Sequence, residues 1–496
     1  MRNSAKNIIA NFINRIWGFL ALYLFSRINL GIVGPDQFGV ISYYALILLI
    51  VSFADVGMSA TITREFAKQA SDGYLRGLLR FFEKIYIAVS IACGAIICLL
   101  AKPITTYWLV SDKLSQNILE HYIYLIGISA ATQFVSLIYF GAIMGKEKQV
   151  WANATQIVFN IIKVVGGTLL LFLYSENLYL FFCWQILCNL AFFFVLRNYV
   201  YKLLKVESST AFTGVSKEMW RYMGSMALAS LLSSVGVQSD KLVASKFLLT
   251  TDYGYFSLAS TLSQLPVMVI VPVAMAIFPV FVRHYSLGDV NRLHKVYETV
   301  LFGIFILVVP LGFVLSLYGE DIFRIWLSTR NLHSAPAEIS MVILLLTVGN
   351  AFQALQLPSY QYLMAKGNTR PPLYQSTVET ILILPFMAFF MSRYGLIGLG
   401  IPWAMLKLFS FIYLQTYTLR IISKTSRIPY GKIIVLPIFV SAAVTLGLYF
   451  VYTSLPNNTF TTLGSIVLTM GASILLSIIF FDKDLLHPSK FKKLFK

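Results

Sequence analysis

The chain has little charge and little cysteine for its length. Charged residues make up 12% of its 496 residues, about half the fraction usual in soluble proteins. Hydrophobic residues make up 58%, and the mean hydropathy is +0.75. This composition excludes a soluble globular protein and indicates an integral membrane protein. The four cysteines all lie inside apolar runs, where we expect small core residues without a disulfide framework or metal-ligand spacing: Cys93, Cys98, Cys183 and Cys188.

Several functional signatures are missing as well. There is no Walker lysine loop, so ATP hydrolysis is not expected. The start of one apolar run contains Gly395, Gly398 and Gly400, which we expect to allow close packing of helices. The first apolar run, 8–30, is interrupted by Arg15 and lacks a small-residue cleavage site, so no cleavable signal peptide is expected. The five histidines are scattered, and we expect neither a metal nor another cofactor.

The chain is instead dominated by apolar runs of about 20 residues, the length of a helix that crosses a bilayer. Their length favours helices over the short alternating strands of a barrel, so the predicted fold class is an all-α polytopic membrane protein. Fourteen spans are predicted: 8–30, 38–62, 82–100, 121–141, 150–174, 179–196, 219–247, 255–282, 296–317, 339–364, 373–391, 396–419, 433–452 and 463–481. They form two six-helix lobes, 1–200 and 219–421, joined by a basic cytoplasmic connector, 201–218. Residues 422–496 add two helices and a basic tail.

Lys and Arg are concentrated in alternate loops. About 28 of the 39 lie at the N-terminus, in every second loop or in the tail. The intervening loops 31–37, 175–178, 248–252 and 454–460 are short and poor in both residues. By the positive-inside rule the basic loops face the cytoplasm, so both termini are predicted there. Membrane topology therefore accounts for the net charge of +18, and no nucleic-acid partner is expected.

Two pairs of segments repeat across the chain. Residues 37–42 (QFGVIS) and 252–257 (DYGYFS) share an acid or amide, an aromatic, a glycine, two bulky residues and a serine. Residues 144–148 (MGKEK) and 364–368 (MAKGN) match at a similar offset. The matches keep register with the predicted spans, so we interpret the chain as a duplicated six-helix unit, an architecture of alternating-access carriers. Self-similarity through composition alone is the alternative.

The segments around these repeats resemble a known family. LGIVGPDQFGVISYYALILLIVSFADVGMSATITRE (30–65) resembles the second helix of the Wzx-type O-antigen flippases, of the polysaccharide transporter family in the MATE-like (MOP) superfamily. DKLVASKFLLTTDYGYFSLASTLSQLP (240–266) with AIFPVFVR (276–283) is similar to the seventh and eighth helices of that family. MGKEK (144–148) and YGLIGLGIPWAM (394–405) also fit.

The resemblance implies a flippase in the bacterial cytoplasmic (inner) membrane. Such proteins move an undecaprenyl-pyrophosphate-linked oligosaccharide from the cytoplasmic to the periplasmic leaflet by alternating access of two lobes. The resemblance also implies that membrane lipids surround the protein, and that a polymerase and a chain-length regulator of the same pathway are its partners. The sugar composition, the kind of surface polymer and the oligomeric state stay open.

Two other functions compete with the flippase. A multidrug or cation extruder of the same fold would favour an acidic lumen, whereas basic residues dominate inside these spans. A membrane polysaccharide polymerase would have a large periplasmic loop, but the longest predicted outward loop, 318–338, has only about twenty residues. The resemblance and the lack of a paired catalytic motif favour a transporter that is not an enzyme.

Ionisable residues inside the spans are the candidate functional residues, because each is costly in hydrocarbon and marks a cavity, an ion path or a buried pair. A pyrophosphate needs cationic donors in a water-filled lumen. The predicted substrate contacts are Arg15, Lys163 and Lys407 within spans, and Arg27 and Lys246 nearer the periplasmic ends. The candidates for coupling to a proton or sodium gradient are Asp55, Asp240 and Glu379. Bracing of a lobe is the alternative for Asp55, and a local pair with Lys241 is the alternative for Asp240.

Overall fold

The computed structural model describes residues 2–55, 57–68, 71–174, 178–204, 214–327, 336–422, 430–456 and 458–480. In these ranges all regular secondary structure is helical, as predicted. Contacts divide the chain into two compact units, Met1–Ser257 (unit 1) and Leu258–Lys496 (unit 2).

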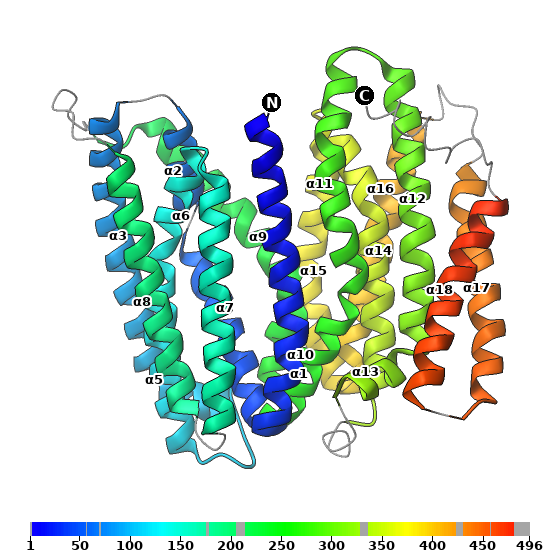
Figure 1. Ribbon diagram of the computed structural model, residues 1–496, viewed down its shortest axis with the longest axis horizontal. Helices are drawn as coiled ribbons and strands as arrows, with labels where there is room; N and C mark the ends of the chain where they lie inside the picture. The colour runs from blue at the N-terminus through cyan, green and yellow to red at the C-terminus, as the bar shows by residue number, and fades with distance from the viewer. Residues whose placement is uncertain are drawn as a thin grey trace. The chain divides into compact units, whose positions relative to one another are not determined.

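Unit 1 begins with a long helix that is bent near its middle, followed by a short 3-10 turn and a series of helices (Figure 1). Its elements are α1 (Arg2–Ser52), η1 (Phe53–Asp55), α2 (Met58–Ala67), α3 (Asp72–Leu99), α4 (Ala101–Tyr107), α5 (Gln116–Phe134), α6 (Ser136–Gly145), α7 (Gln149–Leu173), α8 (Leu178–Leu203), α9 (Lys217–Phe247) and the first half of α10 (Thr250–Ser263).

Unit 2 contains the remaining helices and its own hydrophobic core, in which α12 is buried along most of its length. Its elements after α10 are α11 (Leu265–Ser286), α12 (Val290–Leu317), α13 (Gly319–Leu327), α14 (Ile339–Ala365), α15 (Arg370–Tyr394), α16 (Ile397–Ile422), α17 (Tyr430–Thr453) and α18 (Thr459–Phe480).

The described helices account for about fourteen membrane crossings. Twelve stretches are long and apolar enough to cross a membrane. One of these, Ile9–Asp55, has 47 residues, about 70 Å of helix against a hydrocarbon core of about 30 Å. Gly34, with φ 78° and ψ 172°, interrupts this helix and divides it into two crossings. Helix α9, with 31 residues, is a further helix of spanning length.

Three predicted spans are interrupted in the structure, and one of them, 121–141, is divided at Val135 between α5 and α6. The span 38–62 is broken by η1 and by Gly57, whose φ of 70° is left-handed, so α2 begins as a separate helix. The span 255–282 is divided at Gln264 between α10 and α11. Pro266 stands at the start of α11, and its missing N–H removes one bond that a continuous helix would need.

Unit 1 extends beyond the connector that the sequence placed between the lobes. Helix α9 packs with unit 1: the Trp108 indole N–H donates to Ser245 Oγ at 2.9 Å, and the Thr250 N–H donates to the Val110 carbonyl at 3.0 Å. The contact boundary therefore falls at Ser257. The predicted lobe boundaries stay a prediction.

The second pair of repeats has one local structure. Glu147 and Gly367, which occupy matching positions, both have positive φ, 58° and 71°. The N–H groups that follow them close the same type of turn, from Lys148 to the carbonyl of residue 143 at 3.1 Å and from Asn368 to the carbonyl of residue 363 at 3.0 Å. This bonding ends a helix with a left-handed residue. The two segments are structurally equivalent.

The first pair of repeats meets inside unit 1, where α1 and the first half of α10 approach closely. A Cβ added to Gly39 would lie 1.9 Å from the Thr250 carbonyl oxygen. A Cβ added to Gly254 would lie 2.7 Å from the Pro35 carbonyl oxygen and 3.2 Å from the Gly39 nitrogen. The matching glycines of the two copies thus permit this backbone contact, which explains why the repeat carries glycine.

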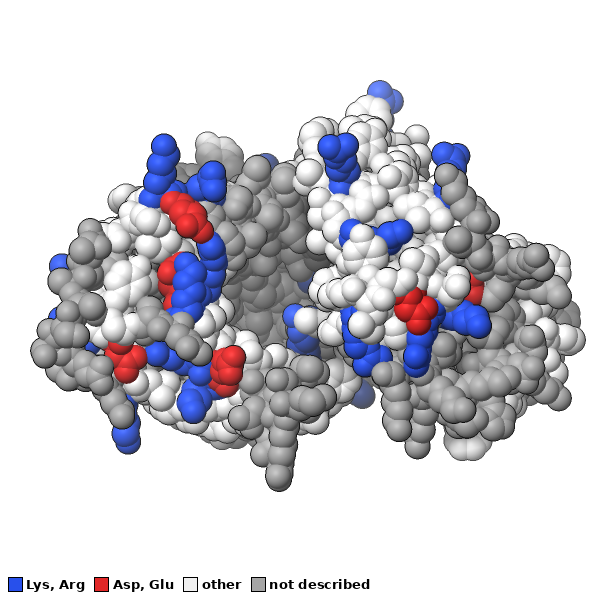
Figure 2. Space-filling view, turned by 90° about the horizontal axis from the view of Figure 1, so that it is seen from above, with Lys and Arg blue, Asp and Glu red and all other residues white. Residues whose placement is uncertain are grey.

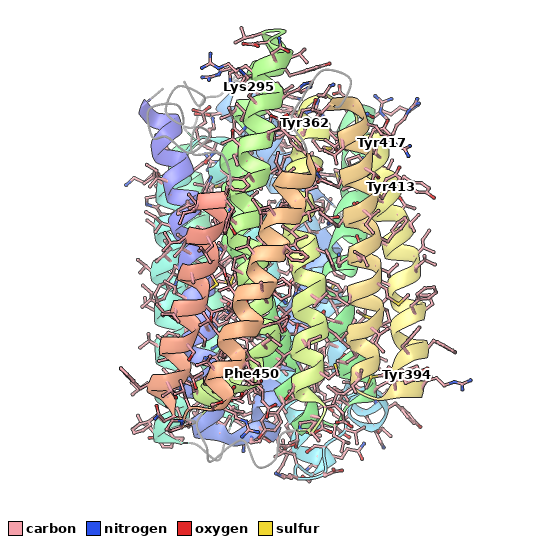
Figure 3. All side chains as sticks on the ribbon, turned by 90° about the vertical axis from the view of Figure 1, so that its right-hand side faces the viewer. Lys295, Tyr362, Tyr394, Tyr413, Tyr417 and Phe450 are labelled. Carbon is pink, nitrogen blue, oxygen red and sulfur yellow. The ribbon has the colours of Figure 1, made fainter. Side chains whose placement is uncertain are left out.

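The ends of each unit carry the side chains that favour a membrane surface. Figure 2 looks onto the end of the view in Figure 1 at which the N-terminus is marked, and it shows Lys and Arg side chains on that face. In unit 2, Lys295 and Tyr362 lie near one end of their helices, and Tyr394 and Phe450 lie near the other (Figure 3). Tyrosine at such ends is typical of the membrane interface. The cytoplasmic orientation of the termini stays a prediction.

Candidate functional site

Lys163 lies near the middle of α7 with hydrogen-bond acceptors that carry no charge. Its ammonium donates to Gln133 Oε1 on α5 and to Asn189 Oδ1 on α8, each at 3.0 Å. Asn189 is itself fixed, because its amide donates to the Ser129 carbonyl at 3.0 Å. Within the described ranges no acidic side chain forms an ion pair with Lys163. The ammonium is therefore solvated by amide oxygens, with no carboxylate of the described residues as its counter-ion.

A cavity of about 220 Å³ adjoins this ammonium, enough for several waters at about 30 Å³ each. Its polar lining is Gln133, Ser136, Gln156, Asn160, Lys163 and Asn189. Phe140, Phe159 and Phe192 contribute aromatic rings to the same cavity. Amide groups both donate and accept hydrogen bonds, so this lining suits a ligand rich in hydroxyl or phosphate oxygens.

One wall of the cavity is tied to the first half of α1 by side-chain amides. The Asn14 amide donates to Asn153 Oδ1 and to Gln156 Oε1, each at 2.7 Å. The Trp17 indole N–H donates to Asn160 Oδ1 at 3.0 Å. Since two of these acceptors also line the cavity, the first half of α1 is held beside Lys163.

Sequence reasoning missed these neutral residues because it searched for charges. The signal that could have found them is a spacing. Gln149, Asn153, Gln156, Asn160 and Lys163 follow one another at steps of four, three, four and three, which places all five on one face of a helix. A polar stripe of this kind inside an apolar run indicates an interface with another helix or with a cavity rather than with lipid.

Arg15 and Arg27 are both exposed on α1. Arg15 follows Asn14, at the edge of the face that contacts α7. Arg27 projects to the other side of the helix from Asn29, whose Oδ1 accepts from the Thr168 hydroxyl at 2.8 Å. In the part of the chain that the structure describes, neither guanidinium forms an ion pair. Their predicted contact with substrate stays a prediction.

Lys407 and Glu379 are brought together in unit 2. Lys407 Nζ on α16 lies 2.5 Å from Glu379 Oε1 on α15, and the two side chains are only 4% and 10% exposed. The Gln375 amide donates to Glu379 Oε2 at 2.5 Å and to Ser410 Oγ at 3.0 Å. Lys407 also lies 4.5 Å from the centre of the Trp403 ring. The sequence assigned the two residues to substrate contact and ion coupling, but here each is the other's counter-ion.

Asp55 occupies the 3-10 turn between α1 and α2 and accepts three hydrogen bonds. The Tyr86 hydroxyl donates to Oδ1, the Ser59 hydroxyl donates to Oδ2 at 2.7 Å, and the Ser59 N–H donates to Oδ1 at 3.2 Å. The carboxylate therefore joins α3 to the first turn of α2. This arrangement matches the bracing alternative that the sequence left open.

The other two predicted residues lie on α9. Asp240 is buried, with 4% of its surface exposed. Lys246 is exposed near the end of the helix, and its ammonium donates to the Tyr107 carbonyl. The structure does not group either residue with Lys163.

A further buried carboxylate escaped the sequence reasoning. Glu83 on α3 accepts from Arg197 Nε at 2.9 Å and from the Tyr201 hydroxyl at 2.5 Å, both on α8. Among the described residues, no group of three or more His, Cys, Asp or Glu is placed to hold a metal ion.

Two family models and a named relative match this chain. The family model described as "Polysaccharide biosynthesis protein" matches residues 1–284, and the MatE model matches residues 225–390. A Shigella flexneri protein named "Putative O-antigen transporter" is 20% identical over 424 residues, which cover 84% of this chain and 99% of that protein.

Two solved structures share the fold. The lipid II flippase MurJ, in an inward closed conformation, has a TM-score of 0.70 at 18% identity and covers 97% of this chain and 99% of its own. A mutant of the Vibrio cholerae MATE transporter VcmN has a TM-score of 0.57 at 13% identity and covers 85% and 98%. These relatives are named for transport, not for catalysis.

Proposed function

The chain belongs to the polysaccharide biosynthesis protein family, and on that premise we propose that it is a flippase for a lipid-linked oligosaccharide. The observation that carries the proposal is the cavity at Lys163, where an ammonium with no counter-ion among the described residues is surrounded by neutral amides and aromatic rings. Polar and ionisable groups are costly inside a membrane and mark a cavity, an ion path or a buried pair; a polar cargo in this cavity accounts for them.

The chemistry of this cavity separates the two transporter classes that the sequence left in competition. A lipophilic cation would be repelled by the Lys163 ammonium, and the lining residues include no carboxylate that could bind it. A phosphate or a hydroxyl-rich sugar would instead find a cation, several amides and three phenyl rings. The names of the relatives, an O-antigen transporter and a lipid II flippase, support the same choice.

The more detailed proposal is movement of an undecaprenyl-pyrophosphate-linked repeat unit from the cytoplasmic to the periplasmic leaflet by alternating access. Lys163 is the proposed cationic contact in unit 1, with Arg15 at the edge of the adjoining helix face. Coupling to a proton or sodium gradient remains part of the proposal. Its candidate groups are the three intramembrane carboxylates Asp55, Asp240 and Glu379.

The experiment is deletion of the gene followed by leaflet-resolved detection of the lipid-linked oligosaccharide. The expected result is loss of surface polymer with repeat units retained on the cytoplasmic face. Single unpolymerised units that reach the periplasm would indicate a polymerase. Unchanged surface polymer would favour the alternative of a multidrug or cation extruder. Expression of the wild-type chain from a plasmid restores transport and serves as the control.

A further inference from the structure

Unit 1 contains a second cavity, of about 500 Å³, whose lining is apolar on nearly all sides. Helix α1 contributes Tyr43, Ile47 and Ile50, and α3 contributes Ile96 and Ile97. Lys246 is the single charged residue among the lining side chains. The cavity differs chemically from the one at Lys163, because its lining has almost no hydrogen-bonding groups and therefore suits an apolar chain.

The cavity has the length of one membrane leaflet. Its lining extends from Tyr43 on α1 to Ala54 in η1, eleven residue steps or about 16 Å at the rise of a helix. Half of a hydrocarbon core of about 30 Å is about 15 Å, and that is the space occupied by one acyl chain of a phospholipid. A polyprenyl chain long enough to cross the membrane would exceed it.

The charged end of the cavity is fixed by hydrogen bonds. Lys246 donates to the Tyr107 carbonyl, and the Trp108 indole N–H donates to Ser245 Oγ at 2.9 Å. An ammonium has three donors, so two remain for a ligand. Tyrosine, tryptophan and lysine at one place are typical of the headgroup level of a membrane.

We propose that this cavity binds one acyl chain of an anionic phospholipid whose phosphate contacts Lys246. The charges match, since a phosphodiester headgroup such as phosphatidylglycerol carries one negative charge and the cavity offers one cation. A polyprenyl pyrophosphate carries at least two charges. The inference is therefore independent of the transported substrate, and it reassigns Lys246 from substrate contact to lipid binding.

The test uses the full-length protein in liposomes of phosphatidylethanolamine with a small fraction of phosphatidylglycerol that carries a diazirine in the middle of one acyl chain. After irradiation, mass spectrometry maps the label. We expect label on the α3 peptide that contains Ile96 and Ile97, with unlabelled phosphatidylglycerol competing better than phosphatidylethanolamine. Lys246→Ala should lower this labelling about fivefold, the effect of one lysine at an anionic lipid surface.

Two further variants make the result specific. Ile96→Trp fills the cavity and should abolish the label, with a normal elution profile showing that the protein is folded. Lys102→Ala removes an exposed lysine from α4 that does not line the cavity, and it should leave labelling unchanged. Equal labelling of wild type and Lys246→Ala would overturn the proposal. Stronger competition by polyprenyl pyrophosphate would do the same, because it would assign the cavity to the carrier lipid.

Discussion

Lys407 and Glu379 form an ion pair in the interior of unit 2, with Nζ 2.5 Å from Oε1 and both side chains almost fully buried. Removal of one partner of a buried pair leaves an uncompensated charge, which costs about 3–5 kcal/mol. We therefore expect Lys407→Met and Glu379→Gln each to lower the thermal stability of the detergent-purified protein. The double variant should recover most of the loss, because it leaves no charge behind.

Transport by the double variant decides what the pair does. If the pair is structural, the stable double variant retains surface polymer. If Lys407 contacts the substrate as the sequence predicted, the double variant is stable and inactive, and that result would contradict a purely structural role.

Lys163→Met should abolish most transport while it leaves the amount of protein in the membrane unchanged. A hydrogen bond to a charged group contributes about 1.5–3 kcal/mol, so surface polymer should fall by roughly one to two orders of magnitude. The measurement is polymer by gel and protein by immunoblot in the same cells. Lys148→Met, at an exposed lysine after α6, is the matched control. Normal polymer in Lys163→Met would remove this cavity from the transport path.

Gly39→Ala should destabilise unit 1. The new Cβ would lie 1.9 Å from the Thr250 carbonyl oxygen, so α1 and α10 must separate. Overpacking typically costs about 1–3 kcal/mol, against which alanine gains about 1 kcal/mol of helix propensity. Gly31→Ala is the control, since nothing lies within 4 Å of its added Cβ. Thermal unfolding should show a lower midpoint for Gly39→Ala and none of this loss for Gly31→Ala.

Asp55→Ala should lower stability by about 1–3 kcal/mol, because the Tyr86 and Ser59 hydroxyls lose a common acceptor. Tyr86→Phe should be destabilising as well, and the double variant should lose less than the sum, as expected for residues in one network. Asp55→Asn keeps an acceptor and should keep transport. Loss of transport by a stable Asp55→Asn variant would instead favour ion coupling.

Glu320 should make one end of unit 2 sensitive to acid. The Ser340 hydroxyl, which donates to Oε2 at 2.6 Å, and the neighbouring Arg324 lower the pKa of Glu320 from its ordinary value of 4.5. A carboxyl group with a lower pKa in the folded state stabilises the fold above the ordinary value, and this contribution is lost as pH falls through the folded-state pKa.

Hydrogen exchange at the start of α14 is the measurement for this acid sensitivity. Exchange, corrected for its intrinsic pH dependence, should rise below about pH 4.5 in the wild type and much less in Glu320→Gln. The effect is small because the side chain is 43% exposed and solvent screens the pair. Identical profiles for the two proteins would contradict the prediction.

The helical membrane fold and the approximate number of crossings could be predicted from the sequence. The match between residues 144–148 and 364–368 corresponds in the structure to two turns of the same geometry. The interruptions at Gly57 and Gln264 could not be located in the same way, because both lie inside continuous apolar runs. Hydropathy measures the cost of leaving water and does not report a local change of backbone direction.

The candidate site was predicted only in part. Lys163 and Lys407 are equivalent in the sequence, since each is a lysine near the middle of an apolar run. The fold distinguishes them, because it places Lys163 among amide oxygens and Lys407 against Glu379, 28 positions earlier in the chain.

By itself the sequence determined that this chain enters a membrane and about how often it crosses. These properties follow from the length and hydrophobicity of single segments, because each helix crosses the bilayer with its own backbone hydrogen bonds satisfied. Only the tertiary structure decided which buried charges are paired and which face a cavity. Pairing depends on the distances between side chains from different helices, and those distances are fixed by packing rather than by composition.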